Sequence, residues 1–291
     1  RQRQMCIRDR YMKGFRQLKN LCGIDVGCTN IKMTAVIGDK SSQISLPSGV
    51  SIPSGDDFTK EELIREISKF YMSFGCDFEG LGIAFSGCTS DGLRVCDTSL
   101  RCLENLSVND FAHLNCKNIK LINDANATVL AGLLEYPDAK VLLDITNGTG
   151  IGCGIVINGQ LFTGANGFAG QIYGNPTVDS NGEIVKNGKI CSGSKVLKKI
   201  VQIPEQELQQ EIIEQAATYL GIEIVSLIHS FNPDVVYLAG GGFSFPNYMD
   251  TLINFIHQHT YSDFLSNLKI VQTDFSSYSG CFGAMKHLLM K

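Results

Sequence analysis

The sequence predicts an α/β fold of two lobes with a central cleft. Two observations support this prediction. A strand, a tight glycine turn and a returning strand occur at residues 21–37 and again at residues 141–157. Amphipathic helices alternate with these strands, which is typical of domains in which helices cover a sheet. Clefts between such lobes commonly bind small molecules.

The composition is that of a chain that buries a core. Hydrophobic residues make up 44% of the 291 residues and charged residues 19%, which does not predict disorder. The mean hydropathy is +0.05. No apolar run approaches the ~18 residues of a membrane span, so we expect no membrane partner. A formal net charge of −4 without a basic block argues against nucleic-acid binding.

The elements of the first lobe follow from local patterns. Two apolar runs, residues 21–26 and 32–37, flank a glycine turn and predict paired strands. Thr59 and Glu62 have capping-box spacing, and the apolar residues after them fall on one helical face. The residues that follow predict a loop at 41–57, a strand at 81–85, short strands and connections at 86–118, a strand at 120–122 and a helix at 125–135.

The second lobe repeats this pattern. We expect strands at 141–145 and 151–157 around a glycine turn, then a hairpin turn at Asn158-Gly159 into 160–163. A long helix at 207–230, a strand at 235–239 and a last helix at 280–290 complete it. Asp25 and Asp144 hold comparable places in the two repeats. We expect a first lobe of residues 11–122, joined by the C-terminal helix at 280–291, and a second lobe of residues 123–279.

Residues 1–10 are interpreted as a scar of a sequencing library and excluded from the fold. Residues 5–9 are what ATG TGT ATA AGA GAC encodes, which looks like a transposon mosaic end used to fragment DNA. An ordinary basic tail is the alternative. With a scar, the natural chain begins at Met12 or has lost upstream residues.

Eleven cysteines are an unusually high number for this length. Their number is odd and no two are spaced C-x-x-C, which argues against a disulfide framework or a local zinc ribbon. We expect free thiols, most of them buried as small hydrophobes, and therefore a cytoplasmic location.

Two loops have the chemistry of phosphate binding. Asp25 precedes a turn of small residues from Gly27 to Thr29, and Lys32 follows in the returning strand. Small residues let backbone N–H groups approach phosphate oxygens, and the carboxylate can hold Mg²⁺ directly or through water. The turn Gly148-Thr149-Gly150 in the second lobe can also bind phosphate through its backbone N–H groups. A single glycine turn is more often structural, but one in each repeat favours phosphate binding.

The chain lacks the P-loop motif and the strand–G-x-G-x-x-G–helix unit of dinucleotide folds. It has instead an ordered set of short motifs at residues 25–32, 82–87, 105–106, 123–127, 148–152, 159, 164–170, 192–193, 232–233, 240–242 and 280–284. In this set the chain resembles the ROK family of sugar kinases, within the actin–hexokinase–Hsp70 superfamily.

The resemblance implies two ribonuclease H-like (actin-like ATPase) lobes. It also implies ATP-dependent phosphorylation of a hexose or N-acetylhexosamine, most often at the 6-hydroxyl as in glucokinases. Asp124 would be the general base, and Asn105 and Asn123 would hydrogen-bond sugar hydroxyls. ATP and Mg²⁺ would bind at Asp25, Thr29 and the glycines Gly240, Gly241 and Gly242. The alternatives are a helix cap for Asp124, turn-forming asparagines, and a plain strand-to-helix turn at the glycines.

This sequence departs from the family pattern at four places. Cys28 replaces the second glycine of the first loop, where a positive φ would cost energy. Gln171 stands where the family has a glutamate, and Asn175 is the closest stand-in for a histidine; both can still hydrogen-bond a sugar. The family's zinc motif should precede Ser192, but only Cys191 is present, so we predict no structural zinc.

The sequence is also compatible with two alternatives to an active kinase. One is a sugar-binding regulator, since some members of the family carry a DNA-binding domain. The other is a non-catalytic or differently specific relative, which the departures at Gln171 and Asn175 favour. A homodimer is expected from the resemblance alone.

Overall fold

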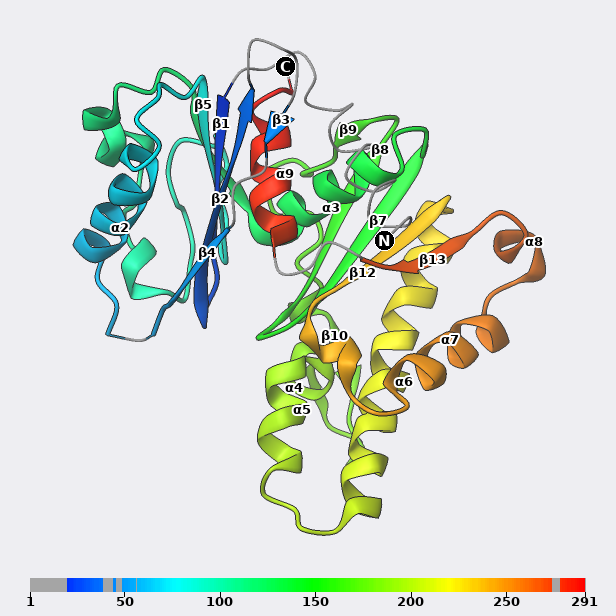
Figure 1. Cartoon of the computed structure of the whole chain (residues 1–291). Coiled ribbons are helices and arrows are strands. Elements are labelled where there is room, and N and C mark those ends of the chain that lie inside the picture. Colours follow the sequence, from blue (N-terminus) through cyan, green and yellow to red (C-terminus); the bar gives the residue numbers. More distant parts are fainter. Residues whose placement is uncertain (1–19, 39–43, 46–48, 56, 274–277, 291) are drawn as a thin grey trace. The chain divides into compact units, whose positions relative to one another are not determined.

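A computed structural model describes residues 20–38, 44–45, 49–55, 57–273 and 278–290 (Figure 1). The proposed scar therefore lies outside the described residues. The chain forms two compact units, which are described separately. Among the described residues, the first unit contains those up to residue 137, residues 163–168 and residues 278–290, and the second contains residues 138–162 and 169–273. The division follows residue 137, whereas we expected it after residue 122, because helix α3 (Asp124–Glu135) packs within the first unit.

The first unit is built on a sheet with strand order β3-β2-β1-β5-β6, in which β4 also pairs with β2. β1 is antiparallel to β2 and parallel to β5, and β5 is parallel to β6. The strands are β1 (Asn20–Val26), β2 (Asn30–Gly38), β3 (Ile44–Ser45), β4 (Val50–Pro53), β5 (Gly80–Phe85) and β6 (Ile119–Asn123). The helices are α2 (Lys60–Met72), η1 (Arg101–Leu103), η2 (Val108–Leu114), α3 (Asp124–Glu135) and α9 (Ser279–His287).

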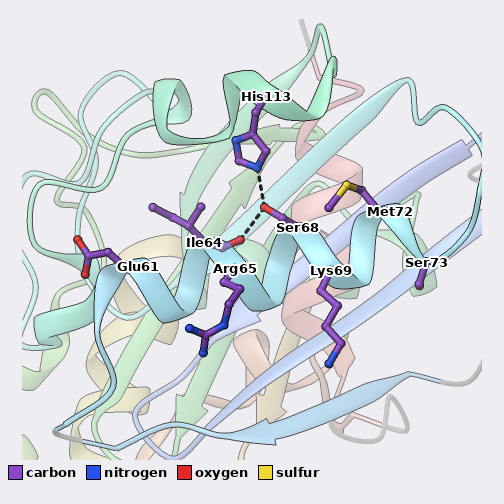
Figure 2. Close-up of a pocket in the computed structure, with 8 residues that line it drawn as sticks. All are labelled: Glu61, Ile64, Arg65, Ser68, Lys69, Met72, Ser73 and His113. Atoms are coloured by element: carbon purple, nitrogen blue, oxygen red, sulfur yellow. Dashed lines mark hydrogen bonds between the residues drawn. The ribbon is translucent and has the colours of Figure 1, made fainter.

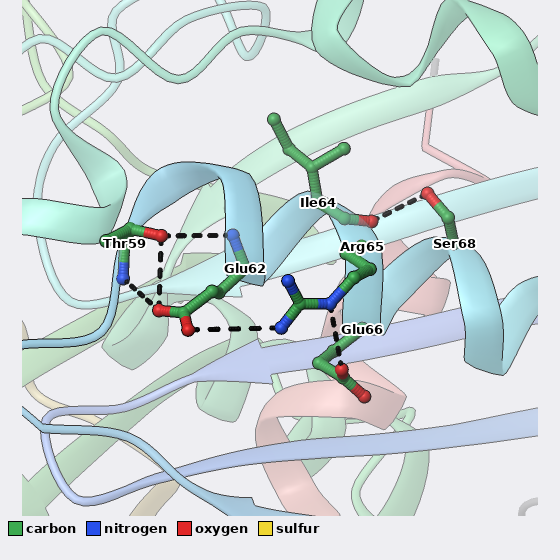
Figure 3. A network of polar contacts seen from close by, with 6 residues as sticks. All are labelled: Thr59, Glu62, Ile64, Arg65, Glu66 and Ser68. Atoms are coloured by element: carbon green, nitrogen blue, oxygen red, sulfur yellow. Dashed lines mark hydrogen bonds and ion pairs between the residues drawn. The ribbon is translucent and has the colours of Figure 1, made fainter.

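Helices cover both faces of this sheet. Apolar residues of α2, such as Leu63 and Ile67, pack with Ile24 and Ile83 of the sheet into one core. α9 lies on the opposite face and packs against α3 (Figure 1). The predicted capping box starts α2: Thr59 Oγ1 accepts from the N–H of Glu62 (3.2 Å), and Glu62 Oε2 accepts from the N–H of Thr59 (2.9 Å) (Figure 3). This prediction is confirmed.

The second unit repeats the same strand order, β9-β8-β7-β12-β13. Its strands are β7 (Val141–Asn147), β8 (Ile151–Ile157), β9 (Gln160–Leu161), β12 (Val235–Ala239) and β13 (Lys269–Gln272), with a separate hairpin of β10 (Pro176–Val178) and β11 (Ile184–Lys186). Its helices are η3 (Ile172–Gly174), α4 (Gly188–Cys191), α5 (Gly193–Ile200), α6 (Gln206–Phe231), η4 (Gly241–Ser244), α7 (Tyr248–His259) and α8 (Ser262–Leu265). Apolar residues of α5, α6 and α7 pack with those of β7, β8 and β12 into its core.

The two repeats align two residues away from the expected register. β1 and β7 are both seven residues long and have the same order of buried and partly buried positions. Counted from the strand ends, Asp25 corresponds to Thr146, and Asp144 corresponds to Gly23. The proposed equivalence of Asp25 with Asp144 is therefore wrong, because β7 continues to Asn147 and not to Ile145. Asp144 is fully buried, whereas Asp25 is partly exposed.

No helix in the described part of the chain is both long and apolar enough to cross a bilayer. The ten cysteines within the described residues are free thiols.

Candidate functional site

Asp25 is the penultimate residue of β1, in the first unit. It lies opposite Lys32 of β2 and beside Ala84 of β5. α9 approaches it closely, because a Cβ atom at Gly280 would lie 2.6 Å from the carboxylate carbon of Asp25. Burial raises the pKa of Asp25 to about 6, although the nearby Lys32 ammonium lowers it. A carboxylate that is costly to ionise without a cation fits a place beside Mg²⁺.

The turn after Asp25 is closed by its own backbone. The N–H of Gly27 donates to the carbonyl of Asn30 (3.1 Å). Ser54, which the sequence did not single out, donates from Oγ to the carbonyl of Gly27 (2.8 Å) and from N–H to the carbonyl of Thr29 (3.0 Å). Cys28 is not among the described residues with positive φ, so the cysteine carries no backbone strain there. Thr29 is exposed and available to a ligand.

Asn123 and Asp124 form the junction between β6 and α3. Asn123 is the N-cap of α3: its Oδ1 accepts from the N–H of Asn126 (3.1 Å). Its Nδ2 donates to the carbonyl of Gly87 and to Oδ1 of Asp124, both at 2.9 Å. The helix begins at Asp124, so capping is the role of Asn123 and not of Asp124. Both amide donors of Asn123 are used within the chain, which leaves only oxygen lone pairs for a sugar.

The pKa of Asp124 is raised to about 7. Burial is the main cause, and the negative charge of Asp25 adds to it. Hydrogen bonds from the N–H of Ala125 (2.9 Å) and from the amide of Asn123 act in the opposite direction. A carboxyl group with a pKa near 7 is suited to accept a proton at neutral pH, because general bases work best when their pKa lies near the working pH.

Asn105 lies on the exposed surface of the first unit with a left-handed backbone, φ 58°. Its carbonyl accepts from Lys60 Nζ (2.9 Å), and the same ammonium pairs with Asp110 Oδ2 (2.9 Å). Among the described residues, no hydrogen bond joins Asn105 to Asn123 or Asp124. The structure thus groups Asp25 with Asp124 and Asn123 electrostatically, while the place of Asn105 in a sugar site stays a prediction.

In the second unit, the turn from Gly148 to Gly150 is braced by the start of α5. The N–H of Gly148 donates to the carbonyl of Gly150 (2.9 Å). Ser194 donates from N–H to the carbonyl of Gly148 (3.0 Å) and from Oγ to the carbonyl of Thr149 (2.6 Å). At Gly148, φ is not positive and a Cβ would meet nothing within 4 Å. The fold itself therefore does not require glycine here, and the role of Gly148 in phosphate binding stays a prediction.

The turn from Gly240 to Gly242 follows β12. Gly240 has φ 108°, a conformation that favours glycine, so this position is fixed by the fold. A Cβ at Gly241 would point into open space. The backbone of this turn therefore has a free side at its middle residue, which fits the adenosine contact that the resemblance implies.

Gln171 and Asn175 flank η3 in the second unit. Gln171 is exposed. Asn175 donates from Nδ2 to Oε1 of Glu223 on α6 (2.7 Å), and Asn187 donates to the other oxygen of Glu223 (3.4 Å). Burial raises the pKa of Glu223, and the two amides lower it. Glu223 is not among the residues predicted from the sequence, although it stands out as a lone carboxylate between Ile222 and Ile224. A sugar-binding role for Asn175 stays a prediction.

The segment where the family's zinc motif was expected forms the β10–β11 hairpin and α4. Cys191 is fully buried, and its thiol lies 3.3 Å from the carbonyl of Asn187. Within the described ranges, no three His, Cys, Asp or Glu side chains converge to hold a metal ion.

One pocket in the first unit is lined by none of the predicted site residues (Figure 2). It has a volume of about 720 Å³ and lies along α2. Ser68 Oγ and His113 Nε2 are 2.8 Å apart at its upper edge in Figure 2. The lining residues are Glu61, Ile64, Arg65, Ser68, Lys69, Met72, Ser73 and His113. The pocket is therefore separate from the junction at Asp124.

Curated proteins of similar sequence include both repressors and kinases. A xylose repressor of Bacillus subtilis is 24% identical over 90% of this chain and 74% of its own length. An N-acetylmannosamine kinase of Vibrio vulnificus is 28% identical over 75% of this chain and 81% of its own length.

Solved structures share the fold. A ROK family protein from Streptococcus pneumoniae in complex with sucrose superposes with a TM-score of 0.75 at 20% identity, over 93% of this chain and 98% of that one. A ROK family glucokinase from Streptomyces griseus in complex with glucose and AMPPNP has a TM-score of 0.72 at 19% identity, over 92% and 98%. The fold is that of the actin-like ATPases, as expected. Residues 21–290 match the ROK family as a whole, and the chain therefore belongs to the ROK family.

Proposed function

We propose that this protein is an ATP-dependent sugar kinase that phosphorylates a hexose or N-acetylhexosamine, most often at the 6-hydroxyl. The observation that carries the proposal is the carboxyl group of Asp124, whose pKa is raised to about 7 at the junction of β6 and α3. The kinases among the relatives, including the glucokinase of Thermotoga maritima (25% identical over 76% of this chain), support the reaction class.

The proposed step is an in-line phosphoryl transfer. The sugar hydroxyl oxygen forms a bond to the γ-phosphorus of ATP, and the bond from that phosphorus to the β,γ-bridging oxygen breaks, releasing ADP. Asp124 accepts the hydroxyl proton on its carboxylate. Asn123 orients that carboxylate through its 2.9 Å hydrogen bond. Positioning and charge neutralisation supply most of the remaining rate enhancement in such transfers.

The nucleotide phosphates are proposed to bind at Gly148–Gly150 and at the turn from Gly27 to Thr29, with Lys32 near the first loop. The adenosine is proposed to lie along Gly240–Gly242. Mg²⁺ bound with ATP would be held by Asp25, directly or through water, and would neutralise phosphate charge. One carboxylate is enough for this, because Mg²⁺ takes most of its ligands from phosphates and water.

The experiment that tests the proposal is ATP consumption against a panel of hexoses and N-acetylhexosamines. We expect ADP release with at least one sugar, and ³¹P NMR of the product should show a phosphomonoester on carbon 6. Sugar binding by calorimetry without ADP release from any sugar would contradict it.

A sugar-binding regulator is the second candidate, because a xylose repressor matches 90% of this chain. A regulator needs the sugar contacts but not the proton transfer at Asp124. It predicts that the same panel gives sugar binding without turnover, and that sugar changes the affinity of the chain for a second macromolecule.

A further inference from the structure

Asn147 is the last residue of β7 and is fully buried in the second unit. Its Oδ1 accepts a hydrogen bond from the N–H of Gly193, the first residue of α5 (2.8 Å). Its Nδ2 donates to the carbonyl of Cys191 (3.3 Å) and to the hydroxyl of Tyr248 (3.1 Å). Because water does not reach this amide, these three bonds fix the orientation of the side chain.

The turn after β12 is shaped around the same residue. A Cβ at Gly240 would meet the carbonyl of Asn147. At Gly242 it would lie 2.6 Å from the amide carbon of the Asn147 side chain. The glycine turn therefore packs directly on Asn147, with no room for a side chain at either position.

Asn147 also precedes the loop from Gly148 to Gly150. Ser194, next to Gly193 in α5, holds this loop by bonds to the carbonyls of Gly148 (3.0 Å) and Thr149 (2.6 Å). The Asn147 side chain thus contacts Gly193 and Gly242 directly. The loop from Gly148 to Gly150, which follows Asn147 in the chain, is held by Ser194, the neighbour of Gly193.

We propose that Asn147 is the positioning residue of the nucleotide site: it locks the start of α5 and the Gly240–Gly242 turn around the loop from Gly148 to Gly150. This inference rests on the proposed function, which assigns the loop and the turn to ATP. Asn147 itself does not touch the nucleotide, because its side chain is wholly buried.

The test uses the full chain and two separate ligands, the non-hydrolysable analogue AMPPNP and the sugar identified by the panel. Asn147→Leu has a similar volume but lacks the amide, so the N–H of Gly193 and the carbonyl of Cys191 lose their partner. We expect AMPPNP affinity to fall by about 10- to 100-fold, as misplacement of a binding loop does, with sugar affinity unchanged.

Tyr248→Phe is the matched control. It removes one of the same three hydrogen bonds, but none that reaches the loop, α5 or the glycine turn. We expect it to lower the midpoint of urea unfolding while AMPPNP affinity stays within about twofold of the wild type. Asn147→Thr, which is neutral, smaller and suited to a strand, repeats the test if the leucine variant fails to fold.

The outcomes separate this inference from the proposed function. Selective loss of AMPPNP affinity in a folded Asn147 variant supports it. Unchanged AMPPNP affinity, or equal loss of nucleotide and sugar affinity, overturns it and leaves the kinase proposal standing. A wild-type protein that binds sugar but not AMPPNP overturns the proposed function and this inference together.

Discussion

Asn123 holds Asp124 through a hydrogen bond of 2.9 Å from Nδ2 to Oδ1, while its own Oδ1 caps α3. One buried amide thus fixes both the start of the helix and the orientation of the proposed base. Capping and orientation can be separated by substitution, because they use different atoms of the same side chain.

Asn123→Ala should lower the free energy of unfolding by about 1–3 kcal/mol, because it removes the cap and leaves the carbonyl of Gly87 without this donor. Asn123→Ser should recover part of that stability, since serine caps helices well, but not the bond to Asp124. Turnover should therefore stay low in both variants. Urea unfolding and the ADP assay on the same samples check this, and wild-type turnover in the serine variant would contradict it.

Asp124→Asn should stabilise the protein above pH 7. The pKa of Asp124 is about 7 in the folded chain and lies near the ordinary value of about 3.9 when unfolded. The folded state therefore binds more protons between these values, and stability falls as the pH rises through this window. Removing the titrating group should raise the free energy of unfolding at pH 8 by about 1–3 kcal/mol. This range is smaller than the full pKa shift would give, because Asp124 is partly exposed and solvent screens its charge. Below pH 4 the substitution should change the free energy of unfolding by almost nothing.

Urea unfolding at pH 4, 6 and 8 measures this effect. Asp91→Asn is the control of opposite sign, because hydrogen bonds from the N–H groups of Leu93 and Arg94 lower the pKa of Asp91. That variant should lose stability at high pH instead. If Asp124→Asn is less stable than the wild type at pH 8, the ionised Asp124 carboxylate stabilises the start of α3, and the predicted cost of ionising it in the folded state is wrong.

Asp25→Asn should move the pKa of Asp124 below 7, because the negative charge of Asp25 raises it in the wild type. Carboxyl ¹³C NMR on aspartate-labelled protein without nucleotide reads this shift directly. Lys32→Met tests the other neighbour of Asp25: the pKa of Asp25 should rise above 6 in this variant, because the Lys32 ammonium lowers it in the wild type. An unchanged Asp124 titration in the Asp25 variant would show that the two carboxylates do not interact.

Gly148→Ala should leave stability almost unchanged, because φ is not positive and a Cβ meets nothing within 4 Å. Its AMPPNP affinity should fall, since the methyl group would occupy the space proposed for phosphate. Gly240→Ala should behave differently and lose more than about 1 kcal/mol, because its φ of 108° disfavours alanine. Gly55→Ala, also in open space, is the neutral control. Wild-type nucleotide affinity in Gly148→Ala would remove this loop from the site.

Much of the fold could be predicted because the repeat is local. Apolar runs around glycine turns fixed both hairpins, and helical spacing placed α6 within a residue of its observed ends. The register between the repeats could not be predicted, because β7 continues through Thr146 and Asn147. These are two polar residues of types that are common in turns. No element is predicted from the sequence between residues 243 and 273, although α7, α8 and β13 lie there.

Only part of the candidate site could be predicted from the sequence. The motifs predict Asp25, Asp124 and the glycine turns as site residues, and the structure adds the electrostatic interaction between the two carboxylates. Asn147 and Glu223 were missed, because their importance comes from contacts with residues 46 and 48 positions away in the chain. Such partners depend on packing between elements, which sequence periodicity does not report.

The most direct measurement is the turnover of Asp124→Asn beside its sugar affinity. We expect a kcat about 10²–10⁴-fold below that of the wild type at pH 8, with the sugar dissociation constant nearly unchanged, because only the proton acceptor is removed. Wild-type kcat in a folded Asp124→Asn protein would contradict the central claim that this carboxylate accepts the proton of the sugar hydroxyl.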